Sequence, residues 1–445
     1  MYRPKPFSIS KKSVQEAYLK IKANKGASGV DQMSMEAFDQ QPQKYLYKLW
    51  NKMSSGSYIP PAIKLVEIPK KDGGKRPLGI PTITDRIGQA VVAGKLGKVV
   101  DNLFHDDSYG YRPKRSALQA VAKTRERCWE YNWVLDVDIK GFFDNIPHDL
   151  LMLAVEKHAK EQWEILYIKR WLVAPLQLED GTIVARMKGV PQGSVIGPIL
   201  SNLYLHYAMD MWLMQNYSDL TFERYADDAV IHCRREEQAI RLKELLGKRL
   251  KDCGLEMHED KTKIVYCKDS NRTNKNSKVV SFDFLGYTFK PRQAQNSQRK
   301  EGFTNFLPGV STKAMTAMNE KLNNMPILRT PGIEIEAVAK AMNPVLQGWV
   351  NYYGKFYSVS LRRFMQRINA KLANWAIRKY KGLRTSITQA MKWVSSLCNR
   401  KPNLFVHWVF GAKPKMEQRY WEPYAVRAAR TVLRESQAEM PGFTY

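Results

Sequence analysis

Two short segments of this chain embed acidic residues in apolar surroundings. The tetrapeptide Tyr225-Ala226-Asp227-Asp228 lies between Phe222 and the pair Val230-Ile231, which predicts two adjacent carboxylates at the tip of an apolar hairpin. Earlier, Leu135-Asp136-Val137-Asp138-Ile139 places acids inside an apolar strand, where an ionised carboxylate is costly unless a cation or hydrogen bonds compensate it. Taken alone, the tetrapeptide is also compatible with an ordinary Asp-rich turn. The two clusters together indicate one divalent-metal site.

Carboxylate oxygens suit one reaction in particular. Joining a 3′ hydroxyl to a nucleoside triphosphate requires stabilising both the attacking and the leaving oxygen, and two Mg²⁺ ions roughly 3.5–4 Å apart achieve this for an in-line displacement. Magnesium takes few carboxylates and completes its shell with substrate phosphates and water, so three acids from two segments suffice. The residue types therefore predict nucleotidyl transfer with Mg²⁺, or with Mn²⁺ as a substitute.

Seven short motifs follow one another along the chain: Ile68-Pro69-Lys70 with Arg76-Pro77-Leu78-Gly79-Ile80-Pro81, Ser108-Tyr109-Gly110-Tyr111-Arg112-Pro113, Asp138-Ile139-Lys140-Gly141-Phe142-Phe143-Asp144, Gly189-Val190-Pro191-Gln192-Gly193, Tyr225-Ala226-Asp227-Asp228, Gly254-Leu255 with Lys261-Thr262, and Phe284-Leu285-Gly286. In this order they resemble the blocks of bacterial group II intron reverse transcriptases, over about residues 10 to 290. Each block is weakly specific, but seven in sequence are strongly so. Gly197-Pro198 departs from the more usual Ser-Pro, a change expected to affect the grip on the template without touching a ligand.

The resemblance assigns roles to the acids. It implies that Asp138, Asp227 and Asp228 hold the metal ions, with the backbone carbonyl of Ile139 as a further ligand. Asp136 is the alternative to Asp138, because both acids lie in one strand and the sequence alone cannot rank them. The family motif has its ligand directly before Ile139 and therefore favours Asp138.

The same resemblance implies a nucleotide pocket. Lys70 and Arg76 match positions that hold the incoming triphosphate, although on so basic a chain they are also compatible with ordinary surface charges. Gln192 is expected to line the pocket, the alternative being a plain Pro-Gly loop. Phe143 matches the bulky residue beneath the sugar, whose ring excludes a 2′ hydroxyl and so selects deoxynucleotides. One of Phe142 and Phe143 is expected to be a core residue.

The composition agrees with a nucleic-acid partner. The 445 residues carry 71 Lys and Arg against 43 Asp and Glu, a formal charge of +28 that a polyanion would screen. No uninterrupted apolar stretch reaches the roughly 18 residues of a membrane span, and no apolar signal core follows the basic start, so a cytoplasmic protein without a membrane partner is expected. The five cysteines lack the spacing of a zinc or disulfide framework and are expected to be reduced and mostly buried.

The elements that must position the acids follow from apolar periodicity. Helices are predicted over residues 13–23, 150–171, 198–212 and 236–253, and strands over 63–68, 133–139, 182–187 and twice within 222–233. The polar runs 268–278 and 291–302 are predicted loops. Strands and helices alternate irregularly, and the pattern is wholly helical beyond about residue 308, which indicates the α+β class. With the resemblance, this predicts a right-hand polymerase: fingers and palm over 1–305, a helical thumb and maturase region over 306–416, and a C-terminal helical extension over 417–445.

Residues 337–416 combine fifteen Lys or Arg with no Asp or Glu, and they include twelve aromatic residues. Unpaired nucleic acid is bound by phosphate contacts together with stacking of bases on aromatic rings. An apolar helical stripe here is expected to be core, and the cations beside it are the candidates for RNA binding. The stripe is Leu361, Phe364, Ile368, Leu372 and Trp375, and the candidate cations are Arg362, Arg363, Arg367, Lys371 and Arg378.

This region also resembles the family's thumb and maturase domain, at Gln347-Gly348-Trp349-Val350-Asn351-Tyr352-Tyr353 and less closely at Leu404-Phe405-Val406-His407-Trp408. The resemblance implies binding of structured intron RNA and assistance to its splicing, besides extension of a DNA or RNA primer on an RNA template with dNTPs. Without paired cysteines or a histidine cluster after residue 416, the family's optional endonuclease is expected to be absent. Two alternatives stay open: a reverse transcriptase of a diversity-generating or defence-associated bacterial system, and a non-enzymatic RNA chaperone with a polymerase fold.

Overall fold

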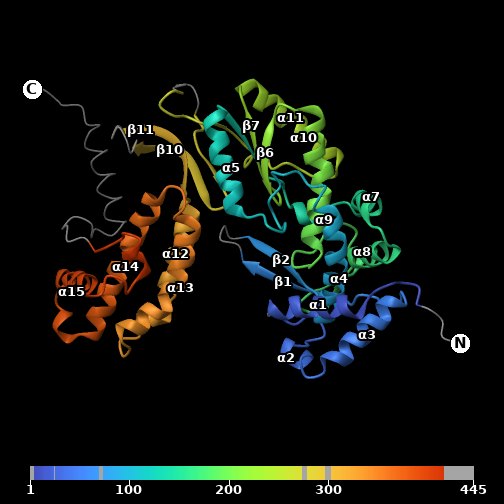
Figure 1. Cartoon of the computed structure of the whole chain (residues 1–445), viewed down its shortest axis with the longest axis horizontal. Coiled ribbons are helices and arrows are strands. Elements are labelled where there is room, and N and C mark those ends of the chain that lie inside the picture. The colour runs from blue at the N-terminus through green and yellow to red at the C-terminus, as the bar shows by residue number, and fades with distance from the viewer. Residues whose placement is uncertain (1–4, 25, 70–73, 273–277, 296–301, 415–445) are drawn as a thin grey trace, which may run out of the picture. The chain divides into compact units, whose positions relative to one another are not determined.

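The computed structural model describes residues 5–24, 26–69, 74–272, 278–295 and 302–414. The chain, drawn in Figure 1, divides into two compact units, Met1–Pro308 and Gly309–Tyr445. Each unit has a hydrophobic core of its own. The division lies close to the boundary expected at residue 305. No helix in the described part of the chain is both long and apolar enough to cross a membrane.

The central sheet of the first unit is antiparallel throughout, with the strand order β6-β7-β3-β8. Its two middle strands, β3 and β7, are largely apolar and almost entirely buried. Helix α5 contacts β6 and β7, and α11 contacts β3, β7 and β8 (Figure 1). The bounds are β3 Trp133–Val137, β6 Thr221–Tyr225, β7 Asp228–Cys233, β8 Lys263–Tyr266, α5 Ala117–Glu130 and α11 Glu236–Asp252.

A second sheet, with the order β2-β1-β4-β5, contains the strand predicted over 63–68 as β1, which pairs antiparallel with β2. Helices α1, α3 and α4 pack against one another in the same unit, and α4 begins at a Thr82 cap that accepts from the Asp85 backbone N–H. The strands are β1 Ile63–Pro69, β2 Lys75–Ile80, β4 Leu176–Gln177 and β5 Ile183–Val184. The helices are α1 Lys11–Ala23, α2 Met35–Phe38, α3 Pro42–Ser54 and α4 Ile83–Val100.

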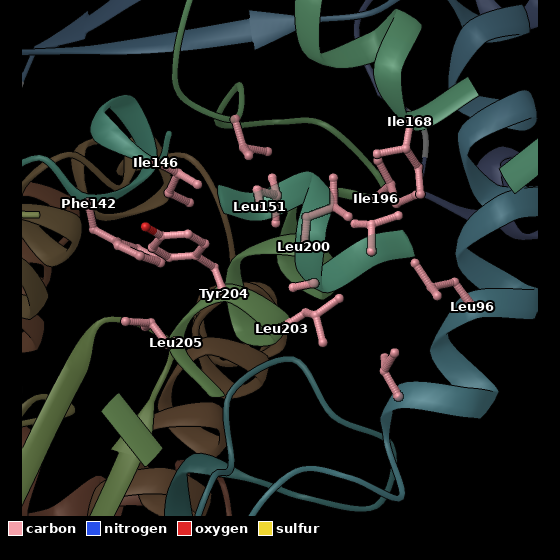
Figure 2. Packing of buried hydrophobic residues seen from close by; sticks show 14 of the residues in the cluster. Leu96, Phe142, Ile146, Leu151, Ile168, Ile196, Leu200, Leu203, Tyr204 and Leu205 are labelled. Atoms are coloured by element: carbon pink, nitrogen blue, oxygen red, sulfur yellow. The ribbon is translucent and has the colours of Figure 1, made fainter. Parts of the chain in front are cut away.

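A helical layer connects the two sheets. The helix predicted over 150–171 is in fact two helices, because the Glu164 carboxylate accepts from the backbone N–H groups of Lys160 and Glu161 and starts a new helix there. Figure 2 shows residues of this layer packed into the buried core, among them Leu151, Leu200 and Leu203. The bounds are α6 Phe142–Asn145, α7 His148–His158, α8 Gln162–Val173, α9 Gly197–Leu205, a π-helical turn His206–Asp210 and α10 Met211–Asn216.

A third sheet corrects one prediction. Residues 291–302 were expected to be a loop, yet β10 spans Tyr287–Gln295 and β11 spans Gly302–Val310, in the order β11-β10-β9 with β9 at Phe282–Phe284. The rings of Phe282 and Phe289 stack with centroids 4.8 Å apart, and burial of such rings outweighs the polar composition of the strands.

The described part of the second unit is helical, as predicted, and the α+β class of the part before it is confirmed. All five residues of the predicted stripe on α14 are buried, as are all five cysteines, which are free thiols. The C-terminal extension predicted over 417–445 lies outside the described residues. The helices are α12 Thr312–Asn323, α13 Ile335–Tyr353, α14 Ser358–Lys379, α15 Ile387–Arg400 and α16 Val406–Val409, with short 3₁₀ turns at Pro326–Arg329 and Lys381–Leu383.

Candidate active site

The paired aspartates lie on a tight turn of the central sheet. Strands β6 and β7 pair with Tyr225 opposite Asp228, so Ala226 and Asp227 form a two-residue turn. Ala226 has φ of 57°, in the left-handed region that such tight hairpins require. The predicted hairpin tip therefore exists and presents both carboxylates at one end of the sheet.

Strand β3 brings the second acidic cluster to the same end. Val137 of β3 lies opposite Ala229 of β7. In this antiparallel register Asp138, one residue later, adjoins Asp228, one residue earlier. Asp136 shares a face with Asp138 because side chains alternate along a strand, but it lies within the ladder rather than at its end. The position favours Asp138 over Asp136 as the neighbour of the turn.

The acidic side chains bring negative charges close together in a partly buried site. Burial raises the pKa of Asp227, and the charge of Asp138 raises it further, while Arg76 and Arg224 act in the opposite direction. Burial also raises the pKa of Asp136 to about 8, with smaller contributions from neighbouring carboxylates. Such an arrangement is relieved by an added cation.

The donor chemistry fits a hard divalent cation, since every predicted ligand is an oxygen. Ile139 and Met257 form an isolated antiparallel β-bridge. Its hydrogen bonds are made by the carbonyl of Asp138 and the N–H of Lys140, the residues on either side of Ile139. Among the residues that the structure describes, no three His, Cys, Asp or Glu side chains are close enough to hold a metal ion as they stand. The ligand assignments thus remain predictions.

The side chain of Arg224 supports the backbone of the aspartate turn. This role was not predicted from the sequence. Its side chain is fully buried and makes a two-pronged ion pair with Asp210, from Nε to Oδ1 at 2.8 Å and from Nη2 to Oδ2 at 2.6 Å. Nη1 donates to the carbonyl of Ala226 at 3.0 Å and to Oδ1 of Asn202 at 2.9 Å. An Arg within an apolar strand was the available signal, because charged side chains are rarely buried unless they are paired.

The motif that begins at Ser108 packs against the same turn. The N–H of Tyr109 donates to the Arg224 carbonyl at 2.8 Å, and Asn202 Nδ2 donates to the Gly110 carbonyl at 2.7 Å. A Cβ on Gly110 would collide with the backbone nitrogen of Ala226, so only glycine permits this approach. The motif thus fixes the position of the turn.

The structure brings two of the predicted nucleotide-binding residues together, since Nε of Arg76 donates to Oε1 of Gln192. The Gly79 N–H also donates to the Gln192 carbonyl at 2.7 Å. Gly193 has φ of 106°, and a Cβ there would collide with the Gly79 carbonyl. Arg76 is close enough to Asp227 to lower its pKa and so connects this pair with the aspartates. Lys70, the other predicted triphosphate ligand, lies outside the described residues.

A buried polar network anchors the loop just after Gln192. Oε1 of Gln89 accepts from the Ser194 hydroxyl at 2.9 Å and from the Val195 N–H at 2.8 Å. Its Nε2 donates to Asp85, which also accepts from Trp171 Nε1 at 2.6 Å. These contacts tie the segment that departs from the family pattern to helix α4.

The two adjacent phenylalanines have different surroundings. Phe142 is 2% exposed and belongs to the core, whereas Phe143 is half-buried. The Phe143 carbonyl accepts from the Val190 N–H at 2.7 Å, which places it beside the loop that carries Gln192. The core residue of the pair is therefore Phe142, and Phe143 stays the candidate for sugar selection.

Four of the five candidate RNA-binding cations on α14 are exposed. The exception is Lys371, which is half-buried, donates to Oδ1 of Asn323 and has its pKa lowered by burial. The guanidinium of Arg362 lies 5.9 Å from the ring of Phe410. The exposed members are Arg362, Arg363, Arg367 and Arg378.

Comparison with known families agrees with this geometry. Residues 68–289 match the family described as reverse transcriptase (RNA-dependent DNA polymerase), and residues 315–393 match the group II intron, maturase-specific domain. The chain belongs to the reverse transcriptases of the group II intron-encoded type. This membership confirms the expected right-hand polymerase fold with a helical region after it. The second match also separates the chain from reverse transcriptases of other bacterial systems.

Individual relatives match only in part. The group II intron-encoded protein LtrA of Lactococcus lactis subsp. cremoris is 31% identical over 280 residues, 60% of this chain and 46% of that protein. Protein YkfC of Escherichia coli (strain K12) is 34% identical over 202 residues, 44% of this chain and 52% of YkfC. A solved telomerase from Candida albicans aligns with a TM-score of 0.45 at 14% identity, over 84% of this chain and 68% of that one, too distant to bear on function. The chain thus spans about half the length of the two sequence relatives.

Proposed function

We propose that this chain is an RNA-directed DNA polymerase that extends a DNA or RNA primer on an RNA template, using dNTPs and Mg²⁺. The observation that carries the proposal is the strand register that brings Asp138 beside Asp228, next to the turn at Asp227. Membership of the reverse transcriptase family supports RNA as the template. Retention of these acids argues against the non-enzymatic chaperone.

Different residues would bind the metal ions and the nucleotide. Two divalent ions, when bound, would supply the positive charge that stabilises the attacking and leaving oxygens. Asp138, Asp227 and Asp228 would hold them after rotation of the carboxylates, since the backbone already brings the segments together. Arg76, held by Gln192 beside Asp227, would bind the triphosphate through a charge-assisted hydrogen bond.

We further propose that the second unit binds structured intron RNA in the cytoplasm and assists its splicing. The match of residues 315–393 to the maturase-specific domain supports this activity. The exposed arginines of α14, in a region without acids, provide charge for phosphate contacts. Splicing of an intron transcript in the presence and absence of the protein would measure it.

Primer extension tests the polymerase activity directly. We expect extension on an RNA template to require Mg²⁺ or Mn²⁺ and to fall to background in Asp227→Ala and in Asp228→Ala, because each variant lacks a metal-binding carboxylate. RNA affinity should be unchanged in both. Asp219→Ala, which removes an exposed acid on the loop before β6, is the matched control and should keep full extension. Retained extension in either site variant, with contaminating polymerase excluded, would remove that residue from the metal site.

A further inference from the structure

A cavity of 460 Å³ lies in the first unit, between the start of α7 and the chain that follows the β4–β5 hairpin. Its walls include Asn145, His148, Val173, Arg186, Met187 and Lys188, and none of the residues assigned above to metal or nucleotide binding. A smaller cavity of 210 Å³ shares Arg186 and Lys188 with it. The larger cavity falls within the size range of sites for small ligands.

Arg186 is a shielded cation whose hydrogen-bonding capacity is only partly used. Nη2 donates to the carbonyls of Trp171 at 2.6 Å and Leu172 at 2.7 Å, near the end of α8. Nε and Nη1 are closed off from solvent and have no hydrogen-bond partner among the residues that the structure describes. Burial lowers the pKa of Arg186 to about 10. Polar groups shielded in this way are rarely left unsatisfied, and a guanidinium with two unused donors fits an oxyanion.

The surroundings of Arg186 favour a phosphate. Lys188 is exposed and donates to Oδ1 of Asn145 at 2.9 Å, which holds its ammonium group at the cavity. Nε2 of His148 bonds the Gly189 carbonyl at 2.8 Å. Asp149 is the one acid among the residues that line the larger cavity, so two permanent cations face one carboxylate there.

An apolar rim adjoins these cations. Met187 is 86% exposed and Val173 is 60% exposed, and both line the larger cavity. Proteins bind single-stranded nucleic acid with cations along the backbone and with flat apolar surfaces, usually aromatic rings, against the bases. Here the exposed Met187 and Val173 side chains offer an apolar surface beside the cations. On a protein of charge +28 that belongs to a family acting on RNA, this combination points to RNA.

We propose that this cavity binds one nucleotide of single-stranded RNA, with its phosphodiester on the exposed Lys188 and, after the guanidinium turns toward the cavity, on Arg186, and with its base against Met187 and Val173. The inference rests on the proposed function only in taking RNA as the partner. The nucleotide could come from the unpaired end of a template or from a bulge of the intron, since both offer the same phosphodiester and base.

Site-specific crosslinking tests the proposal. All five native cysteines are buried, so Met187→Cys gives one accessible thiol that can carry a photoreactive group. Ile59→Cys, at an apolar position of the same unit that is 74% exposed, is the matched control. Two probes are compared: a primer–template with an unpaired 5′ template end, and the intron RNA without primer. We expect strong crosslinking from position 187, little from position 59, and a nucleotide map that distinguishes the two sources.

Charge variants in the Met187→Cys background decide whether the cations hold the RNA. Arg186→Gln and Lys188→Gln should each lower crosslinking about tenfold, as for loss of one charge-assisted hydrogen bond, whereas Arg241→Gln on the exposed face of α11 should not. Arg186→Gln also removes the hydrogen bonds to the α8 carbonyls and can lower the melting temperature. In that case the result for Lys188→Gln, at an exposed position, tests the proposal. Equal crosslinking from positions 187 and 59, or no effect of Lys188→Gln, would overturn the proposal. Loss of primer extension with crosslinking retained would instead count against the polymerase assignment.

Discussion

At the scale of single residues, sugar selection depends on which of two adjacent rings borders the nucleotide. Phe143→Ala should admit ribonucleotides, because removing the half-buried ring opens space for a 2′ hydroxyl. Steric exclusion of this kind is worth about 1–3 kcal/mol, so the preference for dNTPs over rNTPs should fall roughly 5- to 150-fold. Single-nucleotide incorporation with each substrate measures the ratio.

The neighbouring ring provides the control. Phe142→Ala removes a core side chain and should lower the free energy of unfolding by about 3–5 kcal/mol, while sugar discrimination in the folded fraction stays unchanged. If Phe142→Ala loosens selection and Phe143→Ala does not, the alignment of this segment with the family motif is shifted by one residue.

The ion pair beneath the aspartate turn is a second residue-scale feature. Asp210→Asn should leave the fully buried Arg224 without a counter-charge and lower the free energy of unfolding by about 3–5 kcal/mol. Urea unfolding measures this, with the exposed Asp219→Asn as a control that should stay within about 0.5 kcal/mol of the parent. A parent-like stability in Asp210→Asn would mean that hydrogen bonds to Asn202 and Ala226 suffice to hold Arg224.

Residue types predicted where the candidate site lies better than they predicted the residues that support it. Asp227 and Asp228 could be found because acids at the tip of an apolar hairpin are unusual, and their placement on a tight turn followed. The register that brings Asp138 to the same end is a long-range pairing, which the local sequence does not encode. Arg224 and Asp210 were missed for the same reason, since each looks ordinary until its partner is known.

At the scale of elements, strong periodicity predicted the helices and central strands, and the errors came where tertiary contacts prevail. Residues 291–295 are rich in polar side chains and were predicted to form a loop, yet they continue strand β10, which buries Phe289. The break between α7 and α8 was also missed, because the apolar spacing runs through it. In both places a specific partner decides the local conformation.

A buried histidine ties two helices of the second unit and makes their stability depend on pH. Nε2 of His407 and Nε1 of Trp408, both on α16, donate to Oδ1 of Asn369 on α14, while Nδ1 of His407 has no hydrogen-bond partner within the described part of the chain. Burial lowers the pKa of His407 from 6.5 to about 3. As the pH falls below 6.5, His407 is therefore protonated in the unfolded chain but stays neutral in the folded chain. The contribution of the neutral, buried His407 to stability is fully present above pH 6.5 and is lost as the pH falls.

His407→Gln tests this linkage, because glutamine keeps an N–H donor but does not titrate. Between pH 7.5 and pH 5 the parent should lose about 2 kcal/mol relative to the variant, the cost of excluding a proton over roughly 1.5 pH units. Urea unfolding, monitored by hydrogen exchange of the α14 backbone amides, measures the stability of the second unit. A difference between parent and variant that is independent of pH would show that His407 titrates normally in the folded state.

At the scale of the whole molecule, the excess charge is unevenly distributed along the sequence. Residues 337–416 carry fifteen of the 71 basic residues and none of the 43 acidic ones. In the described part of the second unit, the ion pairs of Lys379 with Glu334 and Lys401 with Glu336 draw their acids from before residue 337. Composition alone was enough to predict this basic region, but only the structure separates the buried stripe of α14 from its exposed cations.

Removal of the exposed charge of α14 tests whether it holds RNA. Changing Arg362, Arg363, Arg367 and Arg378 to Gln leaves the buried stripe and the helix propensity nearly unchanged, so stability should barely move. Each arginine that binds a phosphate should, when replaced, weaken binding to intron RNA and reduce the slope of log K against log salt by roughly 0.7 to 0.9. Half-buried Lys371 should contribute less when changed to Gln. Splicing assistance should fall more than extension on a short unstructured template, since only splicing needs a large folded RNA to be held.

The matched control removes the same number of charges from the first unit. Arg235, Arg241, Lys248 and Lys251, at the start of α11 and along it, are exposed and changed to Gln together. Because both fourfold variants lower the net charge equally, a purely non-specific attraction would weaken RNA binding equally in the two. A larger loss of affinity and slope in the α14 variant therefore assigns the RNA-binding role to that helix. Equal losses would mean that α14 presents an ordinary solvated face and that the residues that bind RNA must be sought among the other basic residues of 337–416.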